Sequence, residues 1–536
     1  MTIHAPRRFA LGLLEVSLLS GCLARLAGNA DWWFDAVVLT AAMSLIPSSA
    51  RWCIAVSAGL TWCSFPPCAW RTFWFALVPC LSLWQTEPAA VEGTGSCRER
   101  QRVSCWLWLI CEAWMAGFII CWTTAASMRH LQIPANGAVL FAALCGVHGV
   151  LMIPIAVMVR GLRSWPVLIA SPIGAILATL SREALAGLFG VDWLAHAIAL
   201  PAAATHAAQW SAYIGQRGVA VLVLMLNLLF SANRTWQFEK LSLDRPMRLL
   251  LARGICVWAI MSATGALLAS RTPEVRFPFR VMLVQPHVEA TVLDFNDRAT
   301  ALDVLTRSGL STCADVDLVV WPESSIDARG MVEDVLLPPK VIQNIRRESR
   351  PAYLTGVVRT RPVDHTVYGI PTVRLAQMNS AALISSDGAV QYHDKQKLLP
   401  LIEYVPAWMK PAGISDWLRC GSLEPGLSNV PLRLRTHDDR PVVVAVAICY
   451  EKYFASLPQF QRDYDAIIHL TENSWCRGNP LIPQIELWTC QFRAIETRTW
   501  QVLVSSWQDS GVIDPRGGVR QSVGSRAGWL VYPTPS

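Results

Sequence analysis

Residues 441–451 read PVVVAVAICYE, an unbroken run of β-branched and small apolar residues that ends in a cysteine and a glutamate. Continuous runs of Val, Ile and Leu favour strands that are buried on both faces, as in α/β proteins. The same character appears in the runs RVMLVQ, DLVVWPESS, PAYLTGVV, NSAALISSDG and DAIIHLTENSW, all of which lie after residue 279. We therefore expect the second half of the chain to form an α/β domain with polar groups at its strand ends.

The first half of the chain has the composition of a membrane protein. Mean hydropathy over all 536 residues is +0.34, and 16% of residues are charged, compared with about 25% in soluble proteins. Runs long enough to cross a bilayer of about 30 Å occur near residues 104–125, 137–159, 165–188 and 254–270, with shorter ones near 9–27, 34–50, 52–85 and 217–232. We expect about seven spanning helices within residues 1–272 and a separate domain over residues 273–536. For residues 192–216 we expect a loop, and the alternative is an external segment lying at the membrane interface.

The charge distribution predicts the orientation in the membrane. Residues 1–270 contain 18 Lys and Arg against 11 Asp and Glu, a net charge of +7, whereas residues 271–536 contain 28 of each. A nucleic-acid-binding domain would concentrate basic residues on a soluble face, so we expect no nucleic-acid partner. Basic loops between membrane helices mark the cytoplasmic side, and one span, beginning near Ile255, follows the last basic cluster. We therefore expect the first half of the chain to span the inner membrane of a bacterium and the second half to lie on its periplasmic side.

The cysteines indicate neither a metal site nor a disulfide framework. Eleven of the 16 lie before residue 271, in apolar stretches where cysteine acts as a small hydrophobic residue. The other five are an odd set, which leaves at least one free thiol: Cys313, Cys420, Cys449, Cys476 and Cys490. Except for Cys449, we expect these to be structural, and we expect no metal and no cofactor.

Three residues with complementary chemistry follow apolar runs. Glu323 follows DLVVWP, Cys449 follows VVVAVAI, and Lys395 lies in YHDKQKLLPLIEYVP, residues 392–406. A thiol with a pKa of about 8.5 is mostly protonated at neutral pH, so it needs a base or a nearby cation to attack a carbonyl. Glu323 can be the base, and Lys395, if close, lowers the thiol pKa and stabilises an oxyanion. The structural alternative is a buried Glu323–Lys395 ion pair, and the backbone N–H of Tyr450 is a natural second oxyanion donor.

The blocks WPES, Y-x-x-K-x-x-L-L-P-x-x-E-Y-V-P and AICYE resemble the signatures of the nitrilase (carbon-nitrogen hydrolase) superfamily. Lys395 lies 72 residues after Glu323, and Cys449 lies 54 residues after Lys395, spacings that suit this family. With a membrane region in front, the chain is similar to the apolipoprotein N-acyltransferases, and the related TraB proteins of plasmid conjugal transfer are the nearest alternative. The resemblance implies a polytopic α-helical membrane bundle followed by an α/β nitrilase-like α-β-β-α sandwich.

The resemblance also implies roles for particular residues. Glu323 would be the general base, Lys395 the transition-state stabiliser and Cys449 the nucleophile. Supporting residues are implied at Glu403, Tyr450, Glu451, Asn473 and Trp475.

Each supporting residue also has a structural alternative. Glu403 could form a salt bridge that orients Lys395, Tyr450 and Trp475 could be core aromatics, and Glu451 could be a solvated surface charge.

Some blocks depart from the family pattern. The block P-F-G-E reads PLIE at residues 400–403, N-D-A-W is reduced to the ENSW of residues 472–475, and T-N-N-G appears as SSWQ at residues 505–508. These changes spare the glutamate, lysine and cysteine but bear on which substrate is used.

The reaction implied is the transfer of a fatty acyl chain from a phospholipid to Cys449 and then to an amine, which in the family belongs to a lipoprotein. The alternatives are a TraB-like protein with another substrate, a membrane-tethered amidase or nitrilase that uses water, and a non-catalytic component of a transfer apparatus. We expect a monomer that works at the membrane.

Overall fold

The computed structural model describes residues 19–20, 38–43, 46, 48–64, 76–85, 95–125, 137–191, 194, 197–231, 245–288, 295–332, 351–367, 370–385, 387–405, 422–427, 431–461, 463–476, 481–507 and 509–533. These residues form two compact units that divide between residues 269 and 270, close to the boundary expected after residue 272. We call them the helical unit and the sandwich. Each is described by itself.

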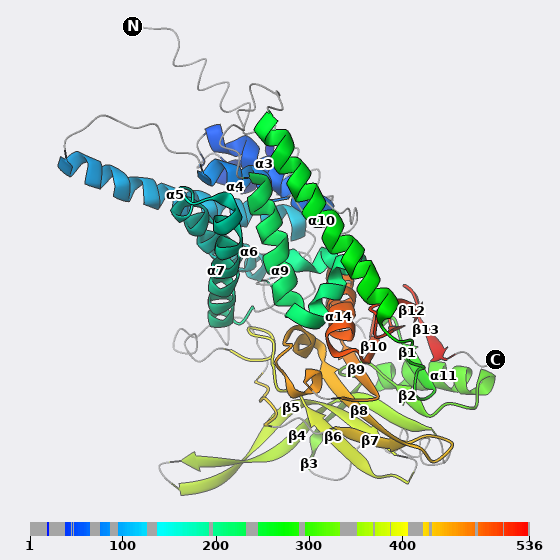
Figure 1. Ribbon diagram of the computed structural model, residues 1–536. Helices are drawn as coiled ribbons and strands as arrows, with labels where there is room; N and C mark the ends of the chain where they lie inside the picture. The colour runs from blue at the N-terminus through cyan, green and yellow to red at the C-terminus, as the bar shows by residue number, and fades with distance from the viewer. Residues whose placement is uncertain are drawn as a thin grey trace. The chain divides into compact units, whose positions relative to one another are not determined.

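The helical unit is built from apolar helices (Figure 1). These are α3 (Ser48–Ser64), α4 (Val78–Gln85), α5 (Gly95–Ala125), α6 (Gly137–Gly161), α7 (Val167–Phe189), α9 (Ser211–Ser231) and α10 (Arg245–Arg271). Four stretches are long and apolar enough to cross a membrane, namely 104–123, 141–161, 167–189 and 206–231, and residues 255–271 form a shorter apolar helix. The expected run near residues 9–27 lies largely outside the described residues, and the run near 34–50 is described only at residues 38–43, 46 and 48–50, so the count of seven spans stays a prediction.

Helices α5 and α6 approach closely because small residues line their contact. A Cβ added to Gly117 of α5 would lie 2.7 Å from the Cα of Gly149 on α6. The indole of Trp114 donates a hydrogen bond to the Gly146 carbonyl at 3.0 Å. Small residues that let backbones touch, together with polar groups bonded across helices, are typical of helix packing in membranes.

The expectation of a loop over residues 192–216 is wrong for its described part. Residues Ala197–Ala204 and His206–Trp210 form two 3₁₀ helices, η3 and η4, whose alanines are largely buried. The segment is itself apolar, but His206 and Trp210 interrupt the run, and the sequence pattern alone does not show that short 3₁₀ helices pack here. The indole of Trp210 donates to the Met261 carbonyl at 3.2 Å, which ties η4 to α10.

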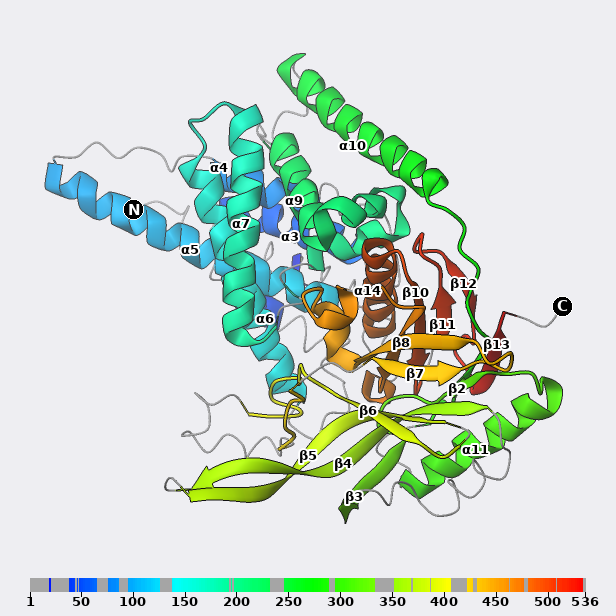
Figure 2. The ribbon, with the colours of Figure 1, turned by 60° about the horizontal axis from the view of Figure 1, so that its bottom comes forward.

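The sandwich contains two mixed sheets. The seven-stranded sheet has the order β13-β1-β2-β4-β5-β6, with β3 also paired to β4, and the six-stranded sheet has the order β12-β11-β10-β9-β8-β7. The strands of the first are β1 (Val281–Gln285), β2 (Leu318–Val320), β3 (Ile326–Val332), β4 (Ala352–Val367), β5 (Ile370–Ile384), β6 (Val390–Asp394) and β13 (Gly528–Tyr532). Those of the second are β7 (Leu432–Arg435), β8 (Pro441–Ile448), β9 (Ala466–Thr471), β10 (Trp500–Ser505), β11 (Gly511–Ile513) and β12 (Val519–Ser522). Figure 2 shows the two sheets, with the long β4–β5 ribbon extending beyond its neighbours.

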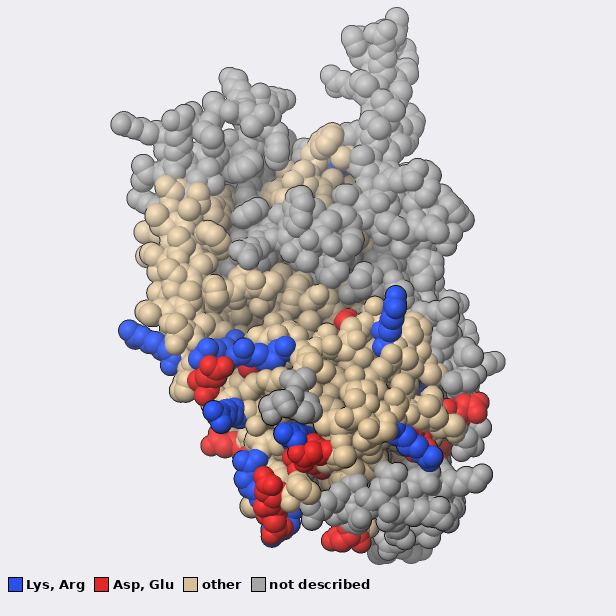
Figure 3. All heavy atoms as spheres, turned by 90° about the vertical axis from the view of Figure 1, so that its right-hand side faces the viewer, with Lys and Arg blue, Asp and Glu red and all other residues tan. Residues whose placement is uncertain are grey.

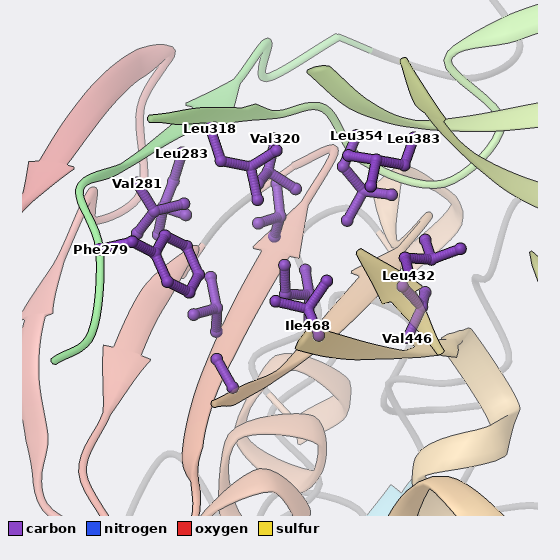
Figure 4. Close-up of a cluster of buried hydrophobic side chains, with 14 of the residues drawn as sticks. Phe279, Val281, Leu283, Leu318, Val320, Leu354, Leu383, Leu432, Val446 and Ile468 are labelled. Carbon is purple, nitrogen blue, oxygen red and sulfur yellow. The ribbon is translucent and has the colours of Figure 1, made fainter. Parts of the chain in front are cut away.

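The core of the sandwich lies between the two sheets. Side chains of both sheets point into one apolar cluster, in which Leu318 and Leu354 face Val446 and Ile468 (Figure 4). The parallel strands β8, β9 and β10 at the centre of the second sheet are buried almost throughout. Burial on both faces explains the uninterrupted Val/Ile/Ala runs that mark these strands in the sequence.

A helical layer covers the outer face of each sheet. Helix α11 (Phe295–Thr312) packs Leu302 against the first sheet, and α14 (Leu481–Thr497) packs Cys490 and Ala494 against Leu503 of the second. The layers are therefore helix, sheet, sheet, helix. The predicted fold class, a helical membrane region followed by an α-β-β-α sandwich, is confirmed.

Candidate active site

The ends of three strands bring the predicted residues together. Glu323 follows β2 and Lys395 follows β6, both in the seven-stranded sheet, while Cys449 follows β8 in the six-stranded sheet. Leu470 of β9 pairs with Ile448, the residue before Cys449, and the Glu472 backbone N–H, two residues further on, donates to Glu323 Oε2 at 2.8 Å. The two sheets thus meet at this edge, with the cysteine on one side and the glutamate on the other.

The Glu323 carboxylate is buried and is held from three directions. Its Oε1 accepts hydrogen bonds from Asn379 Nδ2 at 2.7 Å and from Lys395 Nζ at 3.2 Å. Its Oε2 accepts the backbone N–H of Glu472. With only 4% of the residue exposed, these donors offset the cost of removing a carboxylate from water.

Gly356 of β4 makes room for the turn that carries Glu323. A Cβ at Gly356 would lie 2.5 Å from the Cα of Glu323 and 2.6 Å from the Pro322 carbonyl oxygen. The Gly356 backbone N–H donates to that carbonyl at 3.1 Å, and its own carbonyl accepts the N–H of Ser325 at 3.0 Å. The strand and the turn are therefore in direct backbone contact, which only glycine permits here.

Lys395 bridges two carboxylates. Its Nζ donates to Glu403 Oε1 at 2.9 Å as well as to Glu323, and Asn379 Nδ2 bonds to the same Glu403 oxygen at 2.9 Å. Burial lowers the pKa of the Lys395 ammonium, but the charges of Glu323 and Glu403 outweigh burial and hold that pKa well above its usual value. The ammonium is thus fixed in its charged form, and the salt bridge considered for Glu403 exists.

Cys449 lies in a strained turn. It is the first residue of the 3₁₀ helix η6 (Cys449–Tyr453) and has a φ of 48°, in the left-handed region that side-chain-bearing residues rarely occupy. Burial, and then the negative charge of Glu323, raise the pKa of the thiol well above its usual value, while Lys395 acts in the opposite direction. The lowering expected from Lys395 is therefore present but outweighed, so the resting thiol is neutral and needs a base.

Glu451 joins the nucleophile turn to the lysine loop. One oxygen accepts the Ile448 N–H at 2.8 Å and the other accepts the Gln396 N–H at 2.7 Å, and His393 Nε2 lies 3.2 Å away. Since Ile448 precedes Cys449 and Gln396 follows Lys395, one carboxylate links the two segments. The side chain is fully buried, so the alternative of a solvated surface charge for Glu451 is wrong.

The remaining predicted residues support the framework. Tyr450 packs its ring edge-on against Phe454 at 5.0 Å between centroids. Asn473 Oδ1 accepts the Trp507 N–H at 3.1 Å, and the Trp475 indole donates to the Glu472 carbonyl at 2.5 Å. The contacts of Asn473 and Trp475 brace the segment whose backbone binds Glu323, and the roles of all three residues in catalysis stay predictions.

Sequence reasoning missed several residues of this cluster. Asn379 binds both Glu323 and Glu403, and its one signal was a polar residue opening the apolar run of β5. Arg298 of α11 binds Glu472 at 2.7 Å, a partner more than 170 residues away. Burial raises the pKa of the Glu472 carboxyl, and Arg298 opposes that rise.

Within the part of the chain that the structure describes, no group of three His, Cys, Asp or Glu side chains is arranged to hold a metal ion. The expectations of no metal and no cofactor stay expectations.

No protein-family model matches the chain. Curated proteins named apolipoprotein N-acyltransferase do match. One from Azotobacter vinelandii is 28% identical over 255 residues, 46% of this chain and 45% of that protein, and one from Rhizobium meliloti is 29% identical over 259 residues, 44% of each. The chain thus matches somewhat less than half the length of these relatives.

Solved structures of the nitrilase superfamily also resemble part of the chain. A Saccharomyces cerevisiae member of branch 10 is 16% identical with a TM-score of 0.34, covering 47% of this chain and 88% of its own. A Nesterenkonia amidase is 16% identical with a TM-score of 0.33, covering 49% and 92%. The resemblance expected from the motifs is confirmed by the sequence comparison: this chain, with four helices long and apolar enough to cross a membrane, is a membrane protein similar to the apolipoprotein N-acyltransferases.

Proposed function

We propose that this protein is a membrane N-acyltransferase that moves a fatty acyl chain from a phospholipid, through a thioester on Cys449, to an amine. The acceptor class is the amino group of a lipoprotein, as the names of its relatives suggest. Glu323 is the general base and Lys395 stabilises the oxyanion. The protein works as a monomer in a bacterial inner membrane, with the sandwich in the periplasm.

One observation carries the proposal: a buried carboxylate and a buried ammonium, 3.2 Å apart, both act electrostatically on the thiol of a strained cysteine. A structural ion pair would need neither the cysteine nor its left-handed backbone. Strain of this kind costs about 1–3 kcal/mol and is found where geometry serves a reaction.

The first half-reaction acylates the enzyme. Glu323 takes the thiol proton while Cys449 Sγ attacks the ester carbonyl of the phospholipid, and the Lys395 ammonium donates to the oxyanion that forms. As the tetrahedral intermediate collapses, the carbon–oxygen bond of the ester breaks. Protonated Glu323 returns the proton to the leaving alkoxide, which releases a lysophospholipid.

The second half-reaction transfers the acyl chain. The acceptor amine attacks the thioester carbonyl and Glu323 removes an amine proton, so a neutral amide forms. The carbon–sulfur bond breaks and the Cys449 thiolate regains the proton from Glu323. Both substrates are lipid-anchored, which gives the apolar helices a reason to accompany the sandwich.

The deciding experiment incubates the full chain in detergent with a phospholipid labelled in its acyl chain. We expect a hydroxylamine-sensitive labelled adduct in the wild type and in Cys313→Ala, whose buried cysteine packs in the outer apolar cluster of the first sheet, and none in Cys449→Ala. An adduct of unchanged yield in Cys449→Ala removes the nucleophile assignment.

A diacylated lipopeptide added to the labelled protein distinguishes transfer from hydrolysis. Appearance of a triacylated peptide supports the acyltransferase, whereas free fatty acid alone would mean that water is the acceptor. For the orientation, a reporter fused after Thr300 that is active only outside the cytoplasm supports the periplasmic sandwich, and cytoplasmic activity contradicts it.

A further inference from the structure

A second buried ion pair lies directly behind the nucleophile turn. Lys452, three residues after Cys449 in η6, places its Nζ 2.8 Å from Glu486 Oε1 of α14. The same Nζ donates to Thr471 Oγ1, at the end of β9, at 2.8 Å. The lysine side chain is fully enclosed. The mechanism above uses neither charge.

Glu486 extends this contact to the neighbouring strand. Its Oε2 accepts Asn473 Nδ2 at 3.2 Å, and Asn473 Oδ1 in turn accepts the Trp507 N–H beyond β10. The turn that carries the cysteine is therefore anchored through one lysine to α14 and to the ends of two strands. A strained backbone such as that of Cys449 persists only where the surrounding contacts fix it, and this lysine adds to the contacts that Glu451 makes with the same turn.

Stability alone does not account for this pair. Two charges removed from water recover little of their desolvation cost, and replacing a buried ion pair by apolar residues is often neutral or stabilising by about 1–4 kcal/mol. The charges lie close enough to the thiol to act on it. Lys452 lowers the pKa of Cys449, and Glu486 raises it with a weaker influence.

We propose that Lys452, held by Glu486, is a positioning residue for Cys449: it anchors the nucleophile turn to α14 and keeps a fixed positive charge behind the sulfur as the thiolate forms. The inference rests on Cys449 being the nucleophile of the proposed reaction. It assigns no contact with substrate to Lys452.

The test measures the rate at which iodoacetamide alkylates Cys449, followed by mass spectrometry of the Cys449 peptide between pH 6.5 and 9.5. The variants are Lys452→Met, Glu486→Gln and Lys452→Met/Glu486→Gln in the full chain in detergent. Glu496→Gln is the matched control, since Glu496 pairs with Arg493 on the same helix, 3.0 Å apart. Circular dichroism and unfolding temperature report folding.

We expect the two single variants to shift the alkylation profile in opposite directions. Lys452→Met moves it to higher pH and slows alkylation about tenfold near pH 7.5, since one pKa unit changes the thiolate fraction tenfold. Glu486→Gln moves it to lower pH, the double variant falls between Lys452→Met and the wild type, and Glu496→Gln matches the wild type. In the phospholipid assay, Lys452→Met lowers the acylation kcat and leaves KM unchanged.

If the pair is purely structural, both single variants lower the unfolding temperature and shift the alkylation profile in the same direction, and the folded double variant alkylates like the wild type. That pattern overturns the inference. If Lys452→Met does not fold, the alkylation profile of the double variant alone decides between the two readings. Alkylation of Cys449 needs no lipid, so it tests Lys452 separately from acyl transfer. If the two variants shift the alkylation profile in opposite directions but the protein forms no acyl adduct, the proposed function is wrong while Lys452 still acts on Cys449.

Discussion

The helical unit and the sandwich treat charge in opposite ways. Among the described residues of the helical unit, Arg182 is the only Lys, Arg, Asp or Glu whose side chain is buried. Its guanidinium donates hydrogen bonds to the carbonyls of Leu151 and Leu194, each at 3.0 Å. Large apolar side chains such as Leu168 and Leu180 are exposed instead. The sandwich buries charged groups as paired clusters at its strand ends. Figure 3 shows a face on which charged side chains gather over one part and leave a broad uncharged area beside it.

The difference shows which solvent each unit was selected for. In hydrocarbon an exposed charge has a high free-energy cost and an exposed leucine does not. Helices that contact lipid therefore expose apolar side chains and keep charges off that surface. In the sandwich the buried charges are the energetically costly feature, and their gathering at one edge of two sheets is typical of a reaction site. Four changes test this contrast, in order of decreasing effect.

The first change removes the charge of the proposed base. Glu323→Gln keeps an oxygen for the bonds from Asn379 and Lys395 but cannot accept the thiol proton, so we expect thioester formation to slow by about 10²–10⁴-fold. Glu424→Gln, at a partly exposed ion pair with Arg374, should leave the rate within about twofold of wild type, which is the scatter expected for surface substitutions. Quench-flow measurement of the labelled adduct gives both rates. Equal losses in the two variants would remove the distinction between clustered and surface charges.

The second change puts the same charge on both surfaces. Leu180 of α7 is 57% exposed and Val304 of α11 is 59% exposed. Leu180→Lys should make the free energy of membrane insertion less favourable by about 3 kcal/mol, because lysine near the middle of a spanning helix is strongly disfavoured. Val304→Lys should change the free energy of unfolding by no more than about 0.5 kcal/mol. The fraction of each variant in the carbonate-resistant membrane pellet reports the result. Equal insertion would mean that α7 does not face lipid.

The third change crowds the turn of Glu323. Gly356→Ala should destabilise the protein by about 1–3 kcal/mol, as overpacking does, and should slow acylation because the carboxylate is displaced. Gly161→Ala at the end of α6 meets no atom within 4 Å and should be neutral or slightly stabilising, since alanine favours helix more than glycine does. Unfolding temperatures and acylation rates of the two variants in detergent are compared. A neutral Gly356→Ala would contradict the backbone contact between β4 and this turn.

The fourth change concerns His469, a buried group whose hydrogen-bond partner, Gln501, is uncharged. Burial lowers the pKa of His469 to about 3, while the hydrogen bond that its Nε2 donates to Gln501 Oε1 at 2.7 Å acts the other way. The unfolded chain binds this proton below pH 6.5 and the folded chain does not, so the stability due to His469 is complete above pH 6.5 and is lost as pH falls towards 3. At pH 5.5, one unit below 6.5, the loss is about 1.4 kcal/mol. His469→Gln should remove this part of the pH dependence, and His437→Gln, at an exposed position, should not. Thermal unfolding at pH 7.5 and 5.5 tests both, and an unchanged slope in His469→Gln would contradict the assignment.

Local patterns were sufficient for the features that depend on neighbours in the chain. Apolar runs predicted both the spanning helices and the buried strands, because a strand covered on both faces must be apolar along its whole length. Polar residues at the ends of such runs pointed to Glu323, Lys395 and Cys449, since strand ends are where a buried sheet can present reactive groups. Residues 197–210 were misjudged because an apolar run interrupted by His206 and Trp210 does not show locally that its short 3₁₀ helices pack within the helical unit.

The contacts that tie these groups together were decided by the tertiary structure. Asn379 between two glutamates, Glu451 between two loops and Lys452 against Glu486 each join residues from different elements. Whether a glutamate is solvated or buried depends on which helix or strand packs over it, and that depends on the whole sandwich. The residue types and their order are therefore properties of the sequence, whereas the partner of each buried charge is set by how the sheets and α14 close around the same edge.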